Sequence, residues 1–248
     1  MTALVHAELL KVRTVRSWWA YLVVIVLLAV LATAAEIGPS DAPRDDVGFQ
    51  VGLVEIAGIA ALISIILGIT IVTSEFRHGT ITPTSLVAPH RERVVAAKAV
   101  AAGLLGIVFV LLALAVIAVV AVIWLSIVDA GLHLLDGDVL RRAAQTIFSA
   151  VLWALFGVAI GALVQSQVAA LVGTLVWMFI VETIIWGLLG LVDLDGAAAY
   201  LPFIALDSAD GTHEAHLLSY LPGVAVSLVW IAVAGGAGVL RTVKRDLT

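Results

Sequence analysis

The chain has 248 residues, of which 62% are hydrophobic and only 12% are charged, and its formal net charge is −5. A mean hydropathy of +1.17 and about half the charge content of a soluble domain exclude an ordinary soluble globular protein. The sequence contains no cysteine, which excludes disulfide and thiol chemistry.

Long stretches without Asp, Glu, Lys or Arg define the class of protein. A bilayer core of about 30 Å requires roughly 20 apolar residues in a helix. The apolar residues do not alternate strictly with polar ones, so helices are favoured over barrel strands. We therefore predict an all-α integral membrane protein. The uncharged stretches are Trp18–Ala35, Ala99–Val128, Ala143–Val181 and Leu217–Leu240.

In chain order, the sequence predicts an interfacial helix over residues 1–16 and then six transmembrane helices in a single domain, 1–248. The stretch Ala143–Val181 would be about 58 Å long as one helix, which is too long for one crossing. The polar triplet Gln165-Ser166-Gln167 is the expected turn. The predicted spans are 17–35, 51–73, 95–125, 143–164, 168–192 and 221–240, with a coupling loop at 74–94 and an external loop at 193–220.

Basic residues collect on one side of this topology. Three Arg lie on the other side, together with most of the acidic residues. The positive-inside rule then predicts that both termini are cytoplasmic and that the protein is a multi-pass protein of the cell membrane. The basic residues on the predicted cytoplasmic side are Lys11, Arg13, Arg16, Arg77, Arg91, Arg93, Lys98, Arg241, Lys244 and Arg245, against Arg44, Arg141 and Arg142 outside.

The N-terminal segment favours a helix at the membrane surface. Apolar residues recur at helical spacing, although Glu8 and Arg16 interrupt their face. The polar positions Lys11 and Arg13 suit the headgroup region, as do Trp18 and Trp19. A simple topology anchor is the alternative interpretation of these residues.

Residues 73–98, TSEFRHGTITPTSLVAPHRERVVAAK, form the polar segment between two apolar ones. Thr82-Pro83 is typical of a helix start, and Pro89 disfavours helix at Ala88, so a short helix is expected between the spans. One interpretation is a solvated loop whose cations contact anionic lipid. The other is a docking element for a cytoplasmic partner.

The order of residues in this segment resembles the first cytoplasmic loop of ATP-binding cassette (ABC) exporter permeases of the second exporter class, which have six spans. The start HAELLKVRTVRSWW and the end RTVKRDLT are also similar to that family. The residues that carry the loop resemblance, and that it implies in ATPase coupling, are Glu75, Arg77, Gly79, Thr80, Ser85, Leu86, Pro89, Arg91 and Lys98.

The resemblance implies a permease without its own ATPase, which works with a separate ABC ATPase present in two copies and with a second permease copy. The chain lacks the GxxxxGK[ST] phosphate loop, so ATP and Mg are expected on the partner, with no catalytic residue or cofactor here.

The expected activity is export of a hydrophobic or amphipathic substrate such as a drug, a lipid or a peptide antibiotic. Membrane lipid is an expected partner and nucleic acid is not. A stand-alone secondary transporter or channel is the alternative.

Three further features have two interpretations each. Glu182, inside the fifth span, could hydrogen-bond structurally or belong to a substrate path. The pair Gly157 and Gly161 predicts close helix packing, within the bundle or between subunits. The His213–His216 segment could suggest a metal, but no third ligand is fixed by spacing, so no metal site is predicted.

Overall fold

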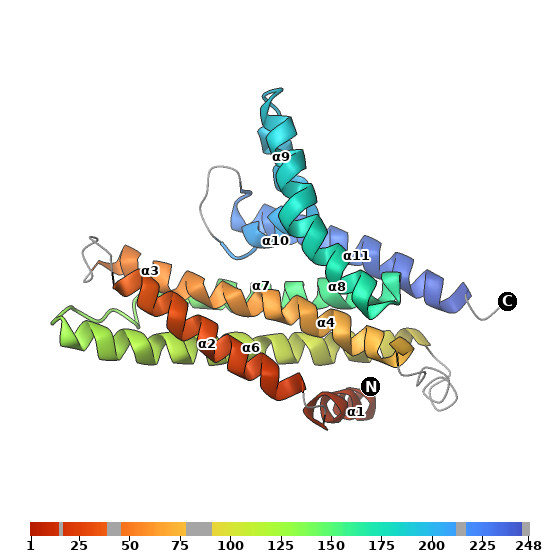
Figure 1. The fold of residues 1–248 in the computed structure, drawn as a ribbon, viewed down its shortest axis with the longest axis horizontal. Coiled ribbons are helices and arrows are strands. Elements are labelled where there is room, and N and C mark those ends of the chain that lie inside the picture. The colour runs from red at the N-terminus through yellow and green to blue at the C-terminus, as the bar shows by residue number, and fades with distance from the viewer. Residues whose placement is uncertain (15–16, 39–45, 78–90, 212–216, 245–248) are drawn as a thin grey trace.

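The computed structural model describes residues 1–14, 17–38, 46–77, 91–211 and 217–244, and most of these residues are helical while none lies in a strand. Figure 1 shows a bundle of long helices lying along one axis, with one arm projecting from it. The all-α prediction is confirmed. The helices are α1 (Thr2–Thr14), α2 (Ser17–Ile37), α3 (Val47–Glu55), η1 (Ile56–Gly58), α4 (Ile59–Arg77), α6 (Arg91–Ile127), α7 (Gly137–Val164), α8 (Gln167–Val176), the π-helical η2 (Trp177–Val181), α9 (Glu182–Gly190), η3 (Asp195–Tyr200), α10 (Pro202–Ser208) and α11 (Tyr220–Lys244).

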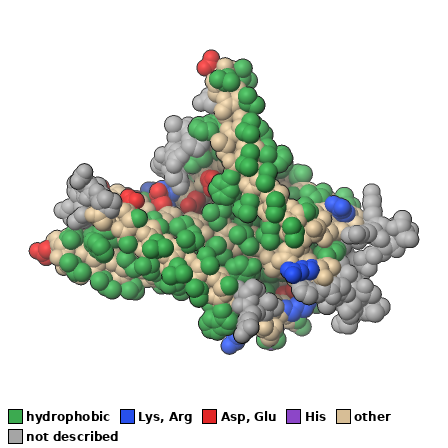
Figure 2. Space-filling view, viewed as in Figure 1, with side chains coloured by type: hydrophobic (Ala, Val, Ile, Leu, Met, Phe, Trp, Pro, Cys, Tyr) green, Lys and Arg blue, Asp and Glu red, His purple; other side chains and the backbone are tan. Residues whose placement is uncertain are grey.

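Six helical segments of the described chain are long and apolar enough to cross a membrane. They extend over α2, α3 to α4, α6, α7, α8 to α9, and α11. Figure 2 shows hydrophobic side chains over most of the visible face of the bundle and of the arm. Because helices satisfy their own backbone hydrogen bonds, such apolar surfaces suit a hydrocarbon environment.

Helix α7 is the centre of the bundle and packs against α4, α6 and α11. Its contact with α4 depends on glycine. A Cβ at Gly157 would overlap the backbone of Ile65, and a Cβ at Gly68 would overlap the carbonyl of Ala154. Gly161 lies close to Ile69 and Val72 of α4 as well. The predicted small-residue face therefore packs within the bundle.

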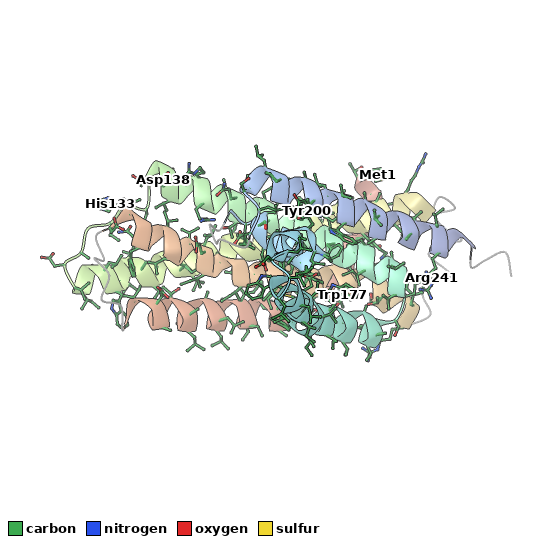
Figure 3. The ribbon with its side chains drawn as sticks, turned by 90° about the horizontal axis from the view of Figure 1, so that it is seen from above. Met1, His133, Asp138, Trp177, Tyr200 and Arg241 are labelled. Carbon is green, nitrogen blue, oxygen red and sulfur yellow. The ribbon has the colours of Figure 1, made fainter. Side chains whose placement is uncertain are left out.

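The chain turns between α7 and α8 at the polar triplet. Gln165 caps α7 in the left-handed region, with φ of 60°, and its N–H donates to the Gly161 carbonyl. From there α8, η2 and α9 form the arm, which leaves the bundle instead of running alongside α7 (Figure 1). Figure 3, turned by 90°, shows this arm nearly end-on between the two ends of the bundle.

The segment expected as an external loop at 193–220 contains two helices, η3 and α10. Its residues fold back onto the bundle, since Phe203 is buried and stacks near Trp153 and Phe156 of α7 at centroid distances of 5.8 and 5.4 Å. Ala205, Leu206 and Ala209 are buried too. Most residues of 202–209 are apolar and are buried against the bundle, whereas the side chain of Asp207 is exposed.

Candidate functional site

One end of the bundle gathers segments that are far apart in sequence. Figure 1 shows α1, the end of α4, the start of α6, the start of α8 and the end of α11 at this end. Figure 3 places Met1 and Arg241 there, and His133 and Asp138 at the opposite end. Residues 78–90 connect α4 to α6 here, so the ends of the predicted coupling loop lie at this end of the bundle.

Four charged side chains at this end form what we call the charge ring: Glu8, Lys11, Glu75 and Lys98. Lys98 Nζ lies 2.7 Å from Glu8 Oε2 and 2.8 Å from Glu75 Oε1. Lys11 Nζ closes the ring at 2.6 Å from Glu8 Oε1 and 2.9 Å from Glu75 Oε1. Each cation thus contacts both anions, and the ring carries no net charge.

The ring is mostly enclosed by the helices that supply it. Lys98, Glu8 and Glu75 are only 3%, 6% and 8% exposed, so each needs its partners to offset the loss of water. Lys98 also donates to the Ile71 carbonyl at 3.3 Å. The ring therefore holds α1 against α4 and α6.

Lys11 is on the open side of the ring, where about half of its side chain is exposed. Burial alone lowers the pKa of Lys11. The hydrogen bonds and negative charges of Glu8 and Glu75 outweigh that effect and raise the pKa above its ordinary value. Lys11 is therefore charged at neutral pH.

The ring unites two sets of residues that the sequence suggested for different roles. Glu8 and Lys11 belong to the predicted interfacial helix, whereas Glu75 and Lys98 belong to the predicted coupling set. Glu75 lies two residues before the end of α4, and Lys98 lies about 10 Å along α6 from its start. The ring consequently fixes the helices on both sides of residues 78–90.

Other predicted residues of this end lie outside the ring. Arg77 ends α4 and donates to Gln167 Oε1 of α8 at 3.2 Å. Arg13 is exposed and Trp19 is 67% exposed, whereas Trp18 packs against Phe109 at a centroid distance of 5.3 Å. Arg16, Gly79, Thr80, Ser85, Leu86 and Pro89 lie outside the described residues, as does the side chain of Arg91.

Glu182, the predicted substrate-path residue, is buried at the start of α9 and its carboxylate accepts three hydrogen bonds. The backbone N–H groups of Phe203 and Ile204 donate to it at 3.0 Å each, and Trp177 Nε1 donates at 3.0 Å. Leu201 provides no side-chain cap for α10. Glu182 therefore caps the N-terminus of α10 from another helix.

A second charged cluster lies toward the opposite end and was not predicted as a site. Arg142 of α7 is buried, and its Nη2 lies 2.7 Å from Glu55 Oε1 of α3. Its Nη1 donates to the Asp210 carbonyl at 3.0 Å. The two residues lie 87 positions apart in the sequence, and no local spacing connects them. Within the described residues no group of His, Asp or Glu is arranged to hold a metal ion, and His213–His216 lies outside them.

The fold and these sites define a class of protein: a multi-pass membrane protein with apolar spans and a polar end that carries the connection between its second and third spans. Residues 4–182 match the family described as ABC-2 family transporter protein. The chain belongs to this family, so it is a membrane subunit of an ABC transporter. Members of the family are membrane components without an ATPase domain of their own. No curated protein matches the chain.

Proposed function

We propose that the chain is the permease subunit of an ATP-driven exporter and that residues 78–90 dock on a separate ABC ATPase. The charge ring is the observation that supports this most strongly. Glu75 and Lys98 connect the helices before and after the loop, α4 and α6, to α1. A movement of the loop would therefore be transmitted to all three helices together. ATP and Mg would bind to the partner.

The same proposal also gives the orientation of the protein in the membrane. The end that carries the charge ring, the C-terminus of α11 and the loop faces the cytoplasm, in agreement with the basic residues at that end. Two ATPase copies would act on two permease copies, because one half-sized permease offers one such loop. Membrane lipid surrounds the apolar faces, and the exported substrate is hydrophobic or amphipathic.

Co-expression with the ATP-binding subunit encoded beside this chain tests the proposal. The complex is purified in detergent, its stoichiometry is measured, and ATP hydrolysis is assayed in nanodiscs. We expect Leu86→Asp to abolish capture of the ATPase, since it places a charge in the apolar part of the segment that we propose to dock. Leu135→Asp is the matched control, because Leu135 is exposed at the opposite end of the bundle.

Retained capture and unchanged ATP hydrolysis in Leu86→Asp would refute docking through the loop. Failure of the folded, monodisperse wild-type chain to capture the ATPase would instead favour a stand-alone transporter or channel. Export is tested separately by ATP-dependent accumulation of a fluorescent amphipathic dye in inverted vesicles. Accumulation that requires both subunits is expected.

A further inference from the structure

The cluster of Arg142, Glu55 and Asp210, called the Arg142 cluster below, joins three parts of the fold. Arg142 comes from α7, Glu55 from α3, and Asp210 from the residues that follow α10. The guanidinium contacts the Glu55 carboxylate with Nη2 and the Asp210 backbone carbonyl with Nη1. The residues 202–211, which we call the seated segment, are thereby fixed against the bundle.

Among the described residues, no cation pairs with the carboxyl group of Asp210. The described ion pairs join Arg142 to Glu55 and not to the Asp210 side chain. The Asp210 Oδ1 atom is buried and has no hydrogen-bond partner in the described part of the chain. Two carboxyl groups thus share one guanidinium, and an ionised Asp210 would leave one buried negative charge uncompensated.

The groups around this carboxyl come from each helix packed against it. Arg142 and Thr146 face it from α7, Glu55 from α3 and Tyr220 from α11. Burial is the main effect and raises the pKa of Asp210 to about 6. The Thr146 hydrogen bond and the Arg142 charge lower that pKa, and the Glu55 charge raises it.

The residues around Asp210 and Gly211 are closely packed. A Cβ on Gly58 would lie 3.1 Å from Asp210 Oδ2. Gly211 has φ of 82°, and a side chain there would clash with Gln145 and Arg142. Ser208 and Ala209 are completely buried. The Asp210 Oδ2 atom therefore lies close to the backbone of η1, and its Oδ1 atom is shielded from water while the segment stays seated.

We propose that Asp210 is a proton-binding site: it carries a proton while residues 202–211 are seated against α3 and α7, and it releases that proton to water when the segment leaves. Only a proton is transferred, and no other reactant is required. The proposal does not depend on the ATPase partner, because it concerns a site at the other end of the bundle.

The difference between the pKa of Asp210 in the seated and unseated states determines how pH affects seating. An unseated Asp210 is exposed to water and has an ordinary pKa near 3.9, whereas the seated group has a raised pKa. The seated state therefore binds more protons, and seating weakens as the pH rises through the interval between the two values. The equilibrium constant for seating is highest below pH 4, falls by about 100-fold as the pH rises to 6, and stays constant at higher pH.

The test uses the full chain in nanodiscs and two measurements. An infrared titration follows the C=O stretch of protonated carboxyl groups between pH 4 and 8. Hydrogen exchange, corrected for the intrinsic pH dependence, follows the amides of Ala205–Ala209. Asp210→Asn is the main variant. Asp207→Asn is the matched control, since Asp207 is an exposed carboxylate of the same seated segment, three residues away.

We expect an infrared transition near pH 6 in the wild type and in Asp207→Asn, and none in Asp210→Asn. The amides should exchange faster at pH 7.5 than at pH 5 in the first two proteins and equally slowly at both in Asp210→Asn. If Asp210→Asn does not fold, Thr146→Val replaces it: loss of the hydrogen bond that lowers the pKa should move the transition to higher pH.

Two results would overturn the proposal. The first is the lack of any transition between pH 5 and 7 in the wild type, or its persistence in Asp210→Asn. The second is a midpoint that moves with the Na⁺ or K⁺ concentration at constant ionic strength, because that would assign the site to a metal cation.

Discussion

Lys98 of α6 and Glu8 of α1 form an ion pair of 2.7 Å across 90 residues of sequence, and both side chains are almost completely buried. The pair fixes a surface helix to the third membrane-spanning segment. Helix α1 packs chiefly against α6, and Leu9 and Val12 pack against the core, so this pair and these apolar contacts together position α1.

Lys98→Met should be strongly destabilising. The substitution keeps most of the volume but leaves Glu8 and Glu75 facing each other with only Lys11, which is half exposed. Loss of one partner from a buried ion pair costs about 3–5 kcal/mol. Thermal unfolding in detergent measures the effect, and Arg93→Met, at an exposed position of α6, is the control. The double variant Lys98→Met/Glu8→Gln should recover part of the loss, and an additive double variant would contradict the ring.

The contribution of Lys11 should disappear at alkaline pH. Its pKa in the folded protein is raised above the ordinary 10.5, so its stabilising effect is complete below 10.5 and is lost as the pH rises through the higher folded value. The difference in melting temperature between wild type and Lys11→Met should be constant from pH 7 to 9 and shrink above pH 10.5. A difference that is already lost at pH 9 would contradict the raised pKa.

The contact between α4 and α7 should tolerate no side chain at Gly157. Gly157→Ala places a methyl group into the backbone of Ile65, and overpacking of this kind costs about 1–3 kcal/mol or more. Gly173→Ala in α8 is the control, because a Cβ there meets nothing within 4 Å. The control should be neutral or stabilising by up to about 1 kcal/mol through helix propensity. Equal melting temperatures for the two variants would show that the helices are farther apart.

Glu182→Gln should release the start of α10. The amide retains one acceptor oxygen, but its NH₂ group faces the N–H donors of Phe203 and Ile204. Hydrogen bonds to charged groups contribute about 1.5–3 kcal/mol each, so the exchange of these two amides should rise by at least about tenfold. Thr183→Val, at the exposed neighbouring position, should leave that exchange unchanged. Impaired transport with unchanged exchange in Glu182→Gln would instead support the substrate-path role.

Length and apolarity were sufficient to predict the helical class and the segments that span the membrane, because a bilayer leaves the backbone few alternatives. The turn at Gln165 could be placed from three polar residues in an otherwise apolar stretch. Glu8 was conspicuous in the sequence as well, because it interrupted the apolar face of α1. Its pairing with Lys98, which also binds Glu75, could not be predicted, because it depends on how α1, α4 and α6 pack together and not on local spacing. The same reason explains Arg142, whose partners come from α3 and from the residues after α10.

The most direct test of the central claim is site-directed cross-linking from the loop to the ATPase. The chain contains no cysteine, so Ser85→Cys introduces a single thiol into the predicted docking helix. Ser126→Cys introduces one at an exposed position near the far end of α6. The complex with the ATP-binding subunit is treated with a short thiol-to-amine cross-linker in nanodiscs. We predict a permease–ATPase product for Ser85→Cys alone, with a yield that changes on addition of ATP and Mg. Equal yields from both positions, or a product only from Ser126→Cys, would contradict coupling through residues 78–90.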